Sequence, residues 1–280
     1  MILVTTAGKV GAEAARLLAQ RGASVRVLAR DPEKAAALGQ VGVDVVEGDL
    51  DAPATIDAAM QGVTSVVLVS PAVPAQELNV VDSAVRAGVG HIVKITSKAA
   101  ADSPIARQRG QAEIEAGLIA SGLGYTLLRN NFYMQNVLML ASAITKTSRF
   151  GSSAGAGHVG FIDARDVAAV AAEIAASPAA HVGKTYWLSG PELLSYADVA
   201  AALSTILGRP IVFRERTIGE DKQAMMSVGV PEPLAAMNAH AVSLIAEGDA
   251  AWLSEDAPAI LGRPARTFEQ FATDHAAAFS

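Results

Sequence analysis

The sequence predicts an α/β protein with a doubly wound parallel sheet and a smaller, mainly helical C-terminal lobe. Short β-branched runs alternate with Ala-rich helical patterns from the first residue onward, which is the rhythm of βαβ units. The runs are continuous stretches of Val, Ile and Leu, as in parallel strands that helices cover on both faces. Every aromatic residue lies at or after Tyr125, so the later part of the chain has a different composition.

The alternation predicts the elements in chain order. We expect strands at residues 2–5, 25–28, 43–46, 65–69, 91–96 and 125–129. Helical patterns fill the connections at residues 13–20, 32–38, 54–60 and 75–87. Because parallel strands are joined by right-handed crossovers, a Rossmann-type sheet is the simplest topology. We place one domain at residues 1–150 and a second lobe at 151–280, interleaved with late strands of the sheet.

Composition excludes several classes of protein. With 280 residues, 51% of them hydrophobic and 18% charged, the chain buries a large core and is not disordered. A net charge of −6 without basic runs argues against nucleic-acid binding. The chain has no cysteine and no paired histidine spacing, so we expect no metal site. It has no basic leader and no apolar run of about 20 residues, so we expect a cytoplasmic protein without membrane segments.

A glycine-containing segment, Thr5-Thr6-Ala7-Gly8-Lys9-Val10-Gly11, follows the first predicted strand and leads into a helical pattern. There Gly8 allows the backbone to approach a pyrophosphate, Gly11 allows close helix–strand packing, and the helix N-terminus offers free N–H groups. The full glycine pattern requires glycine where Thr5 stands, and threonine adopts a positive φ less readily. We predict dinucleotide binding because the segment follows the first strand of a βαβ series.

A second glycine run, Gly155-Ala156-Gly157-His158-Val159-Gly160, matches G-x-G-x-x-G literally. Residues 145–153 before it are polar and contain glycine, so no strand is expected there. No acidic residue closes a second strand about 20 positions later. We interpret the run as a flexible loop that does not bind phosphate.

The residue at the end of the second strand distinguishes the two nicotinamide cofactors. Enzymes that use NAD carry an acid there, which binds the ribose 2′-hydroxyl. This chain has Arg30, beside Asp31, and a guanidinium complements a 2′-phosphate. We therefore predict NADP(H); the alternative is that Arg30 is only a solvated charge. Adenine and nicotinamide-ribose contacts are expected at the ends of the third and fourth strands, at Asp49, Leu50, Val69, Ser70 and Pro71.

Several longer motifs occur along the chain: EGDL at residues 47–50, SGLGYTLLRNNFYMQN at 121–136, FIDARDVA at 161–168 and GKTYWLSGP at 183–191. Together with the N-terminal loop they resemble the NmrA-like atypical short-chain dehydrogenase/reductases, over nearly the whole chain. The resemblance implies a Rossmann domain, a smaller C-terminal substrate lobe and bound NAD(P)H. It also implies that the cofactor is contacted by Thr6, Gly8, Lys9, Val10, Gly11, Arg30, Asp49, Leu50, Ser70 and Thr96. Thr5 departs from the family glycine.

The family includes quinone reductases, dye reductases and ketoreductases, and also regulators that sense NADP without catalysis. The fold alone does not choose among them. The likeness of the whole chain suggests a ketoreductase of an angucycline-type antibiotic pathway.

One expected catalytic pair is absent. Ordinary short-chain dehydrogenases use Tyr-x-x-x-Lys, in which lysine lowers the pKa of the tyrosine so that the phenol protonates the oxyanion. The residues four positions after Tyr125, Tyr133, Tyr186 and Tyr196 are Arg129, Val137, Gly190 and Ala200. A positioned general acid contributes about 10²- to 10⁴-fold to the rate, so the chain needs another proton source, reacts more slowly, or performs no chemistry.

Three proton sources remain open. Ser97 and Lys98 close the fifth strand and could hydrogen-bond a carbonyl, unless Ser97 caps a helix and Lys98 is solvated. Tyr133 follows the sixth strand and either lines the substrate pocket or packs in the core. Water or a hydroxyl of the substrate could donate the proton instead, with the protein supplying hydride geometry and a dry pocket. We favour this last source.

The sequence thus predicts an NADPH-dependent reductase of a ketone or quinone-like carbonyl on a bulky, polycyclic or polyketide-like small molecule. The alternative is a non-catalytic, NADP-sensing regulator. We expect a monomer or a weak homodimer. The late aromatic and methionine residues either shape an apolar pocket or fill an ordinary helical core.

Overall fold

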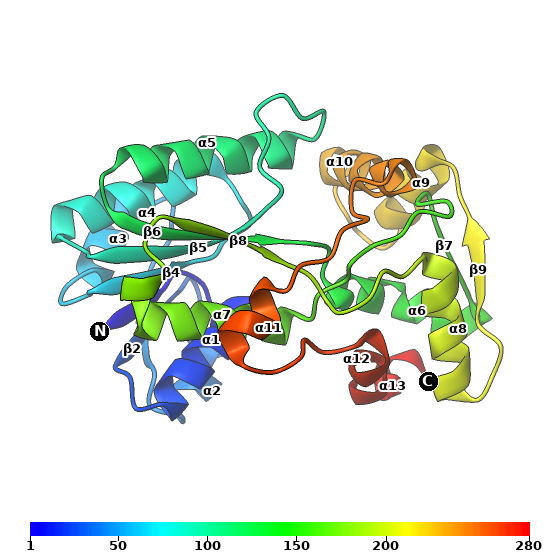
Figure 1. The fold of residues 1–280 in the computed structure, drawn as a ribbon, viewed down its shortest axis with the longest axis horizontal. Helices are drawn as coiled ribbons and strands as arrows, with labels where there is room; N and C mark the ends of the chain where they lie inside the picture. The colour runs from blue at the N-terminus through cyan, green and yellow to red at the C-terminus, as the bar shows by residue number, and fades with distance from the viewer. The chain divides into compact units, whose positions relative to one another are not determined.

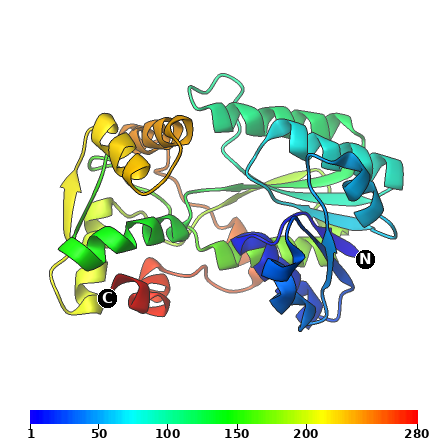
Figure 2. The ribbon, with the colours of Figure 1, turned by 180° about the vertical axis from the view of Figure 1, so that it is seen from behind.

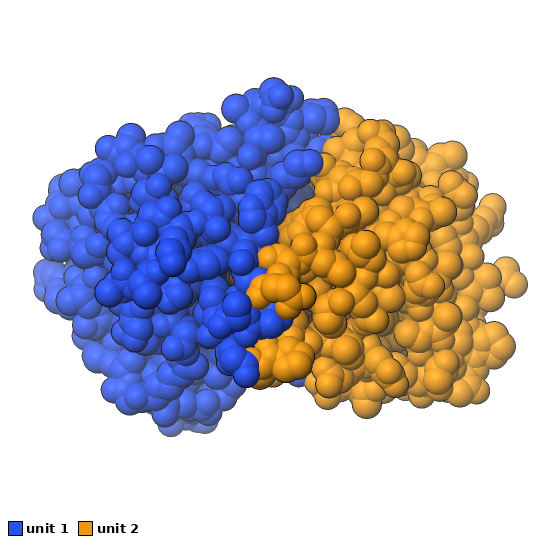
Figure 3. Space-filling view, viewed as in Figure 1, with its two compact units in different colours: residues 1–130, 164–187, 256–262 blue, residues 131–163, 188–255, 263–280 orange.

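The structure is a computed structural model that describes residues 1–280. The chain forms two compact units, coloured separately in Figure 3. Unit 1 contains residues 1–130, 164–187 and 256–262, and unit 2 contains residues 131–163, 188–255 and 263–280. The chain therefore leaves unit 1 after residue 130 and not at residue 150, because Val137 and Ile144 bury their side chains in the core of unit 2.

Unit 1 is built on a seven-stranded sheet in the order β3-β2-β1-β4-β5-β6-β8. Its strands are β1 (Ile2–Val4), β2 (Val25–Ala29), β3 (Asp44–Glu47), β4 (Ser65–Leu68), β5 (His91–Ser97), β6 (Gly124–Asn130) and β8 (Lys184–Leu188). The first six strands pair in parallel, with Ile2 opposite both Val25 and Ser65. The predicted Rossmann-type sheet is confirmed, and all six strands predicted from residues 2–129 are present within about two residues.

Helices cover both faces of this sheet, as Figures 1 and 2 show from opposite sides. One face carries α3 (Pro53–Ala59), α4 (Pro74–Ala87) and α5 (Ala106–Ala120). The other carries α1 (Lys9–Gln20), α2 (Ala36–Gly39) after η1 (Pro32–Ala35), α7 (Ala164–Ala176) and α11 (Asp256–Leu261), and η3 (Pro178–Ala180) precedes β8. This cover explains why the strands are apolar without alternation.

Unit 2 is mainly helical around one short parallel sheet, β7 (Arg149–Ser152) with β9 (Val212–Glu215). Its helices are η2 (Met134–Leu140), α6 (Ala141–Thr147), α8 (Tyr196–Leu207), α9 (Ile218–Ser227), α10 (Glu232–Ser243), η4 (Leu244–Glu247), α12 (Phe268–Asp274) and α13 (Ala276–Phe279). The core is aromatic: Phe161 lies 5.7 Å from Tyr196 and 6.4 Å from Phe268, centroid to centroid. These rings fill the core of a helical lobe, which was one of the two roles expected from their position in the sequence.

The second glycine run belongs to unit 2 and corrects one expectation. A strand, β7, does precede it. No helix follows until α7, and the glycines pack against backbone: a Cβ on Gly157 would lie 2.0 Å from the Ile245 carbonyl oxygen, and one on Gly160 would lie 2.4 Å from that of Trp252. The glycines of this run thus serve close packing, and the strand–turn–helix geometry of a phosphate loop is absent.

No helix is long and apolar enough to span a membrane.

A buried histidine makes the stability of unit 1 sensitive to acid. His91 is 2% exposed, with Nε2 3.0 Å from Thr126 Oγ1. Burial, and secondarily the nearby His181, lowers the pKa of His91. As the pH falls below the ordinary histidine pKa of about 6.5, the unfolded chain takes a proton that the folded chain refuses, so stability is lost down through the depressed pKa.

We therefore expect His91→Gln to flatten the loss of unfolding free energy between about pH 7 and pH 5, by up to about 1.4 kcal/mol per pH unit. Urea denaturation across this range measures it. His240→Gln, at an exposed position of α10, is the matched control and should leave the slope unchanged. Equal slopes for wild type and His91→Gln would contradict the assignment.

Candidate functional site

The carboxyl ends of β1 and β4 form the topological switch point of the sheet. β1 lies between β2 and β4, and the chain leaves it first toward β2 and later returns on the other side as β4. In open parallel sheets, ligands bind in the crevice outside the strand ends at this point. The segments that follow β1 to β5 all emerge at this edge, which is therefore the candidate site of unit 1.

The first of these segments is fixed by Thr5. Its backbone N–H donates to the Val67 carbonyl at 3.1 Å. Its hydroxyl donates to the Val69 carbonyl at 2.8 Å and accepts from the Val69 N–H at 2.9 Å. Thr5 is 1% exposed, and no residue from 5 to 11 has a positive φ. The turn therefore needs no left-handed residue, and Thr5 occupies the glycine position of the full pattern with its hydroxyl bonded to both backbone groups of Val69.

The two glycines of the loop have different roles. A Cβ on Gly11 would lie 2.0 Å from the Thr6 carbonyl oxygen and 3.3 Å from Val4 Cγ1, so only glycine lets α1 pack this closely on the loop. A Cβ on Gly8 would have only the Thr6 hydroxyl within 4 Å, at 3.8 Å. Gly8 is exposed and leaves open space beside the helix start.

The first turn of α1 is suited to an anion. Gly8 precedes it in an extended conformation and offers no side-chain cap, and the turn contains no acidic residue. The N–H groups of Lys9, Val10 and Gly11 have no carbonyl partner inside the helix. These donors, the helix dipole and the exposed Lys9 side chain all favour negative charge.

Arg30 directly follows β2 and is exposed. It makes no ion pair or side-chain hydrogen bond. The neighbouring Asp31 instead pairs with Lys34, with Nζ 2.8 Å from Oδ2, and the hydrogen bond from Lys34 lowers the pKa of Asp31. The acid is thus neutralised within its own segment, and the guanidinium stays available for a phosphate.

The segment after β3 is held by its own backbone and core contacts. A Cβ on Gly48 would lie 2.5 Å from Leu28 Cδ1, so the backbone at Gly48 packs closely against the Leu28 side chain. Asp49 accepts a hydrogen bond from the Asp51 N–H at 3.0 Å. Leu50 is 6% exposed and packs in the core of unit 1. The predicted contacts of Asp49 and Leu50 with a cofactor stay predictions.

The segment after β4 contains Val69, Ser70 and Pro71. The Val69 backbone is bound to Thr5 as described, and Pro71 is exposed. The Ser70 hydroxyl donates to Glu77 Oε1 at 2.6 Å and accepts from the Ala72 N–H at 3.1 Å. Ser70 is therefore locked in one orientation at the edge of the sheet.

The end of β5 joins a buried polar network. Thr96 is 3% exposed, and its hydroxyl lies 3.1 Å from Glu115 Oε1 on α5. Glu115 also binds Arg129 of β6, with Nε 3.2 Å from Oε1. Ser97 and Lys98 follow and are both partly exposed. Ser97 does not cap α5, because the helix begins only at Ala106, so this alternative for Ser97 is wrong.

Tyr133 belongs to unit 2. It precedes η2 and bridges to Ile162 in parallel. Burial raises the pKa of its phenol above the ordinary value. In the Tyr-x-x-x-Lys pair the shift has the opposite direction, so this environment makes Tyr133 a weaker acid. Ser97, Lys98 and Tyr133 stay predictions as catalytic residues.

Sequence reasoning missed a buried ion pair behind the candidate site. Glu77 of α4 and Lys94 of β5 are both 0% exposed, and their Oε2 and Nζ atoms lie 2.7 Å apart. The sequence does contain an indication, since a lysine inside the apolar run His91-Ile92-Val93-Lys94-Ile95 must find a partner if the strand is central. The identity of that partner follows only from the packing of α4 on the sheet.

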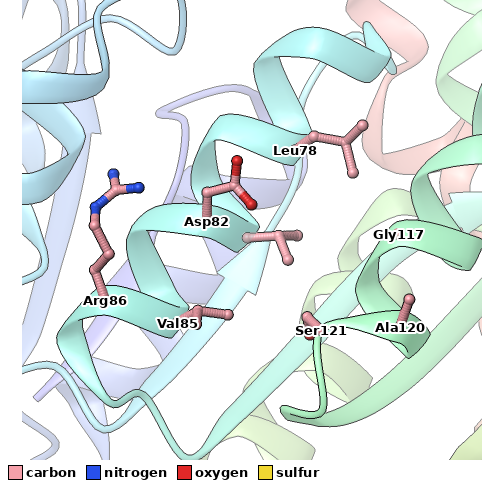
Figure 4. A pocket seen from close by; sticks show the side chains of 8 residues that line it. Leu78, Asp82, Val85, Arg86, Gly117, Ala120 and Ser121 are labelled. Atoms are coloured by element: carbon pink, nitrogen blue, oxygen red, sulfur yellow. The ribbon is translucent and has the colours of Figure 1, made fainter.

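An open groove lies between α4 and α5, and Figure 4 shows the side chains that line it. Most of them are aliphatic or small, including Leu78, Val85 and Ala120. The two helices approach closely at Gly117, where a Cβ would lie 2.4 Å from Leu78 Cδ2. Arg86 is paired with Asp57. Its polar lining residues are Asp82, Arg86 and Ser121. The edge of the sheet at the switch point is the better candidate for a binding site, because open parallel sheets bind their ligands there.

The sheet order, the crossovers and the loop after β1 define a Rossmann-type α/β protein. A model of the NmrA-like family matches residues 1–256, so the chain belongs to the NmrA-like family. This confirms the resemblance derived from the sequence motifs.

Individual relatives agree with this assignment over the full length. The chain is 40% identical to an NAD(P)H azoreductase of Xenophilus azovorans, covering 100% of this chain and 99% of the relative. It is 37% identical to the (4-alkanoyl-5-oxo-2,5-dihydrofuran-3-yl)methyl phosphate reductase of Streptomyces griseus, with the same coverage. Among solved structures, it is similar to the NADPH complex of the quinone oxidoreductase QOR2 from Escherichia coli, with a TM-score of 0.89, 30% identity and 99% coverage of both chains.

The two glycines give a test of the loop. We expect Gly11→Ala to lower the free energy of unfolding by about 1–3 kcal/mol, since the added methyl group clashes with the Thr6 carbonyl. Gly8→Ala meets open space and should cost less than about 1 kcal/mol, the usual cost of alanine before a helix. Urea denaturation of both variants measures the difference. Equal losses would contradict the close approach at Gly11.

Proposed function

We propose that the protein is an NADPH-dependent reductase that delivers hydride to a conjugated carbonyl or quinone-like group on a bulky organic molecule. The main support for NADPH as the cofactor is Arg30, an exposed guanidinium without a partner at the end of β2. A 2′-phosphate provides the bidentate partner that this group lacks. The family relatives named above, an NAD(P)H azoreductase and a quinone oxidoreductase bound to NADPH, support the same cofactor.

Different residues at the switch-point edge bind different parts of NADPH. The first turn of α1, with Gly8, Lys9 and Gly11, receives the pyrophosphate. Arg30 receives the 2′-phosphate, on the β2 side of β1. The segments after β4 and β5, with Ser70 and Ser97, lie on the opposite side of β1 and face the nicotinamide half. When bound, NADPH supplies the hydride.

The missing Tyr-x-x-x-Lys pair bears on the substrate. Hydride addition to an isolated ketone leaves a localised alkoxide, which needs a positioned acid. Addition to a quinone or an unsaturated carbonyl spreads the charge over the conjugated system, so water or a substrate hydroxyl suffices as proton source. The names of two relatives reported above, an azoreductase and a dihydrofuran phosphate reductase, also describe conjugated acceptors. Assignment to an antibiotic pathway and an oligomeric state stay predictions.

The cofactor assignment is tested at Arg30. We expect Arg30→Ala to weaken NADPH binding by about tenfold or more while NADH binding changes little, because a charge-assisted pair with the 2′-phosphate contributes roughly 1.5–3 kcal/mol. Fluorescence titration with each nucleotide measures both affinities. Arg21→Ala is the control, since it removes the same charge from a surface pair with Glu173. An unchanged NADPH to NADH ratio in Arg30→Ala would falsify the role.

The reaction is tested with a substrate panel. We expect NADPH oxidation with quinones, azo dyes and dihydrofuranones. For polycyclic ketones whose carbonyl group is not conjugated, we expect kcat/KM to be at least about a hundredfold lower, because a positioned acid contributes about that factor. Cofactor absorbance follows the reaction. The absent Tyr-x-x-x-Lys pair is also what a cofactor-sensing regulator of this family would show. NADPH binding without turnover of any acceptor would favour that second function and overturn the reductase.

A further inference from the structure

The Glu77–Lys94 ion pair lies inside the apolar core of unit 1 and yet touches the edge of the sheet. Lys94 Nζ also donates to the Ile95 carbonyl at 2.6 Å. Burial lowers the pKa of Lys94, and the contact with Glu77 opposes that shift. Burying two charges costs several kcal/mol per ion before pairing, and an apolar pair of similar volume would often be as stable. Stability alone therefore does not account for the pair.

The Glu77–Lys94 ion pair is linked to Ser70 through the Glu77 carboxylate. Glu77 uses Oε2 for Lys94 and Oε1 for the Ser70 hydroxyl, at 2.7 and 2.6 Å. An ionised carboxylate accepts hydrogen bonds and donates none. The proton of Ser70 therefore points toward Glu77, and the Ala72 N–H takes one of the two lone pairs of the hydroxyl oxygen at 3.1 Å. The second lone pair is left as an acceptor.

The segment around Ser70 is held from both ends. Thr5 bonds both backbone groups of Val69, and α4 begins at Pro74. Between these points Ala72 has φ 64°, a left-handed conformation that a non-glycine residue adopts at a cost of about 1–3 kcal/mol. The hydrogen bond from the Ala72 N–H to Ser70 helps to hold this conformation. Backbone strain of this kind is concentrated at ligand sites.

We propose that Glu77 and Lys94 are positioning residues that make Ser70 a dedicated hydrogen-bond acceptor for a ribose hydroxyl of the nicotinamide half of NADPH. The proposal rests on the proposed cofactor. A phosphate is itself an acceptor, so a serine whose proton is committed to Glu77 does not serve the pyrophosphate or the 2′-phosphate. Ser70 follows β4, on the opposite side of β1 from Arg30, where the nicotinamide half is expected.

The experiment compares NADPH with 2′,5′-ADP, which contains only the adenosine half with its 2′-phosphate. Wild type, Ser70→Ala and the double variant Glu77→Met/Lys94→Met are titrated with each probe by calorimetry. The double variant replaces the ion pair by apolar side chains of similar volume and should fold. We expect both variants to bind NADPH about two- to tenfold more weakly, as for the loss of one neutral hydrogen bond, with unchanged affinity for 2′,5′-ADP.

A further probe identifies which group of the cofactor donates a hydrogen bond to the Ser70 oxygen. The reduced 3-acetylpyridine analogue of NADP keeps both ribose hydroxyls but lacks the carboxamide N–H groups of nicotinamide. The loss in Ser70→Ala should be the same for this analogue as for NADPH. A loss that occurs with NADPH but not with the analogue would assign the contact to the carboxamide and overturn the ribose assignment.

A matched control separates positioning from general destabilisation. Arg26→Met removes the contacts of Arg26 with Asp44, Ala59 and Gln61, which lie away from Ser70. It should lower the free energy of unfolding without changing either affinity. Unchanged NADPH binding in Ser70→Ala or in the double variant, or an equal loss for 2′,5′-ADP, would overturn the inference. Failure of wild type to bind NADPH at all would instead remove the proposed function.

Discussion

The hydrogen bonds between the Thr5 hydroxyl and the Val69 backbone join the carboxyl ends of β1 and β4 at the switch point of the sheet. A glycine at this position could not make them. Because both backbone groups of Val69 are used, the segment after β4 starts from a fixed position, and the segment after β1 enters α1 without a left-handed residue. The donors of the α1 N-terminus and the acceptor at Ser70 both depend on this junction.

At the solvent-facing edge of the sheet the charges favour an anionic ligand. In the protein interior behind this edge, acidic and basic side chains are paired with each other. The start of α1 carries no acid, and Asp31 is neutralised by Lys34. Inside, carboxylates on α4 and α5 meet basic groups on β5 and β6. These inner pairs lie behind the strand ends that are proposed to bind the cofactor, and rigid polar groups in such a position hold contacting side chains in one geometry.

The fold could be read from the sequence because buried parallel strands are continuous apolar runs and helices separate them. All predicted strands follow this pattern. The features of the fold that the sequence did not predict depend on tertiary packing. Segment 131–150 carries no linker signal, so its place in unit 2 depends on where Val137 and Ile144 find a core. Likewise, β7 is too short and too polar for periodicity to reveal it, since it pairs only with β9, which is distant in sequence.

The candidate site was only partly accessible to sequence reasoning. Gly11 and Arg30 occupy positions that the βαβ pattern defines by itself. The roles of Thr5 and Ser70 depend on partners about 64 and 7 residues away, and a local pattern does not contain such partners. Lys94 was visible as a charge within an apolar strand, whereas Glu77 looked like an ordinary polar residue of a helix.

Binding of NADPH at the edge formed by the segments after β1, β2 and β4 is the proposal on which the other assignments depend. It can be measured by titration calorimetry of the unmodified protein with NADPH and, separately, with NADH. We expect saturable one-to-one binding of NADPH and clearly weaker binding of NADH. Absence of binding heat with both nucleotides, at several temperatures, would contradict it.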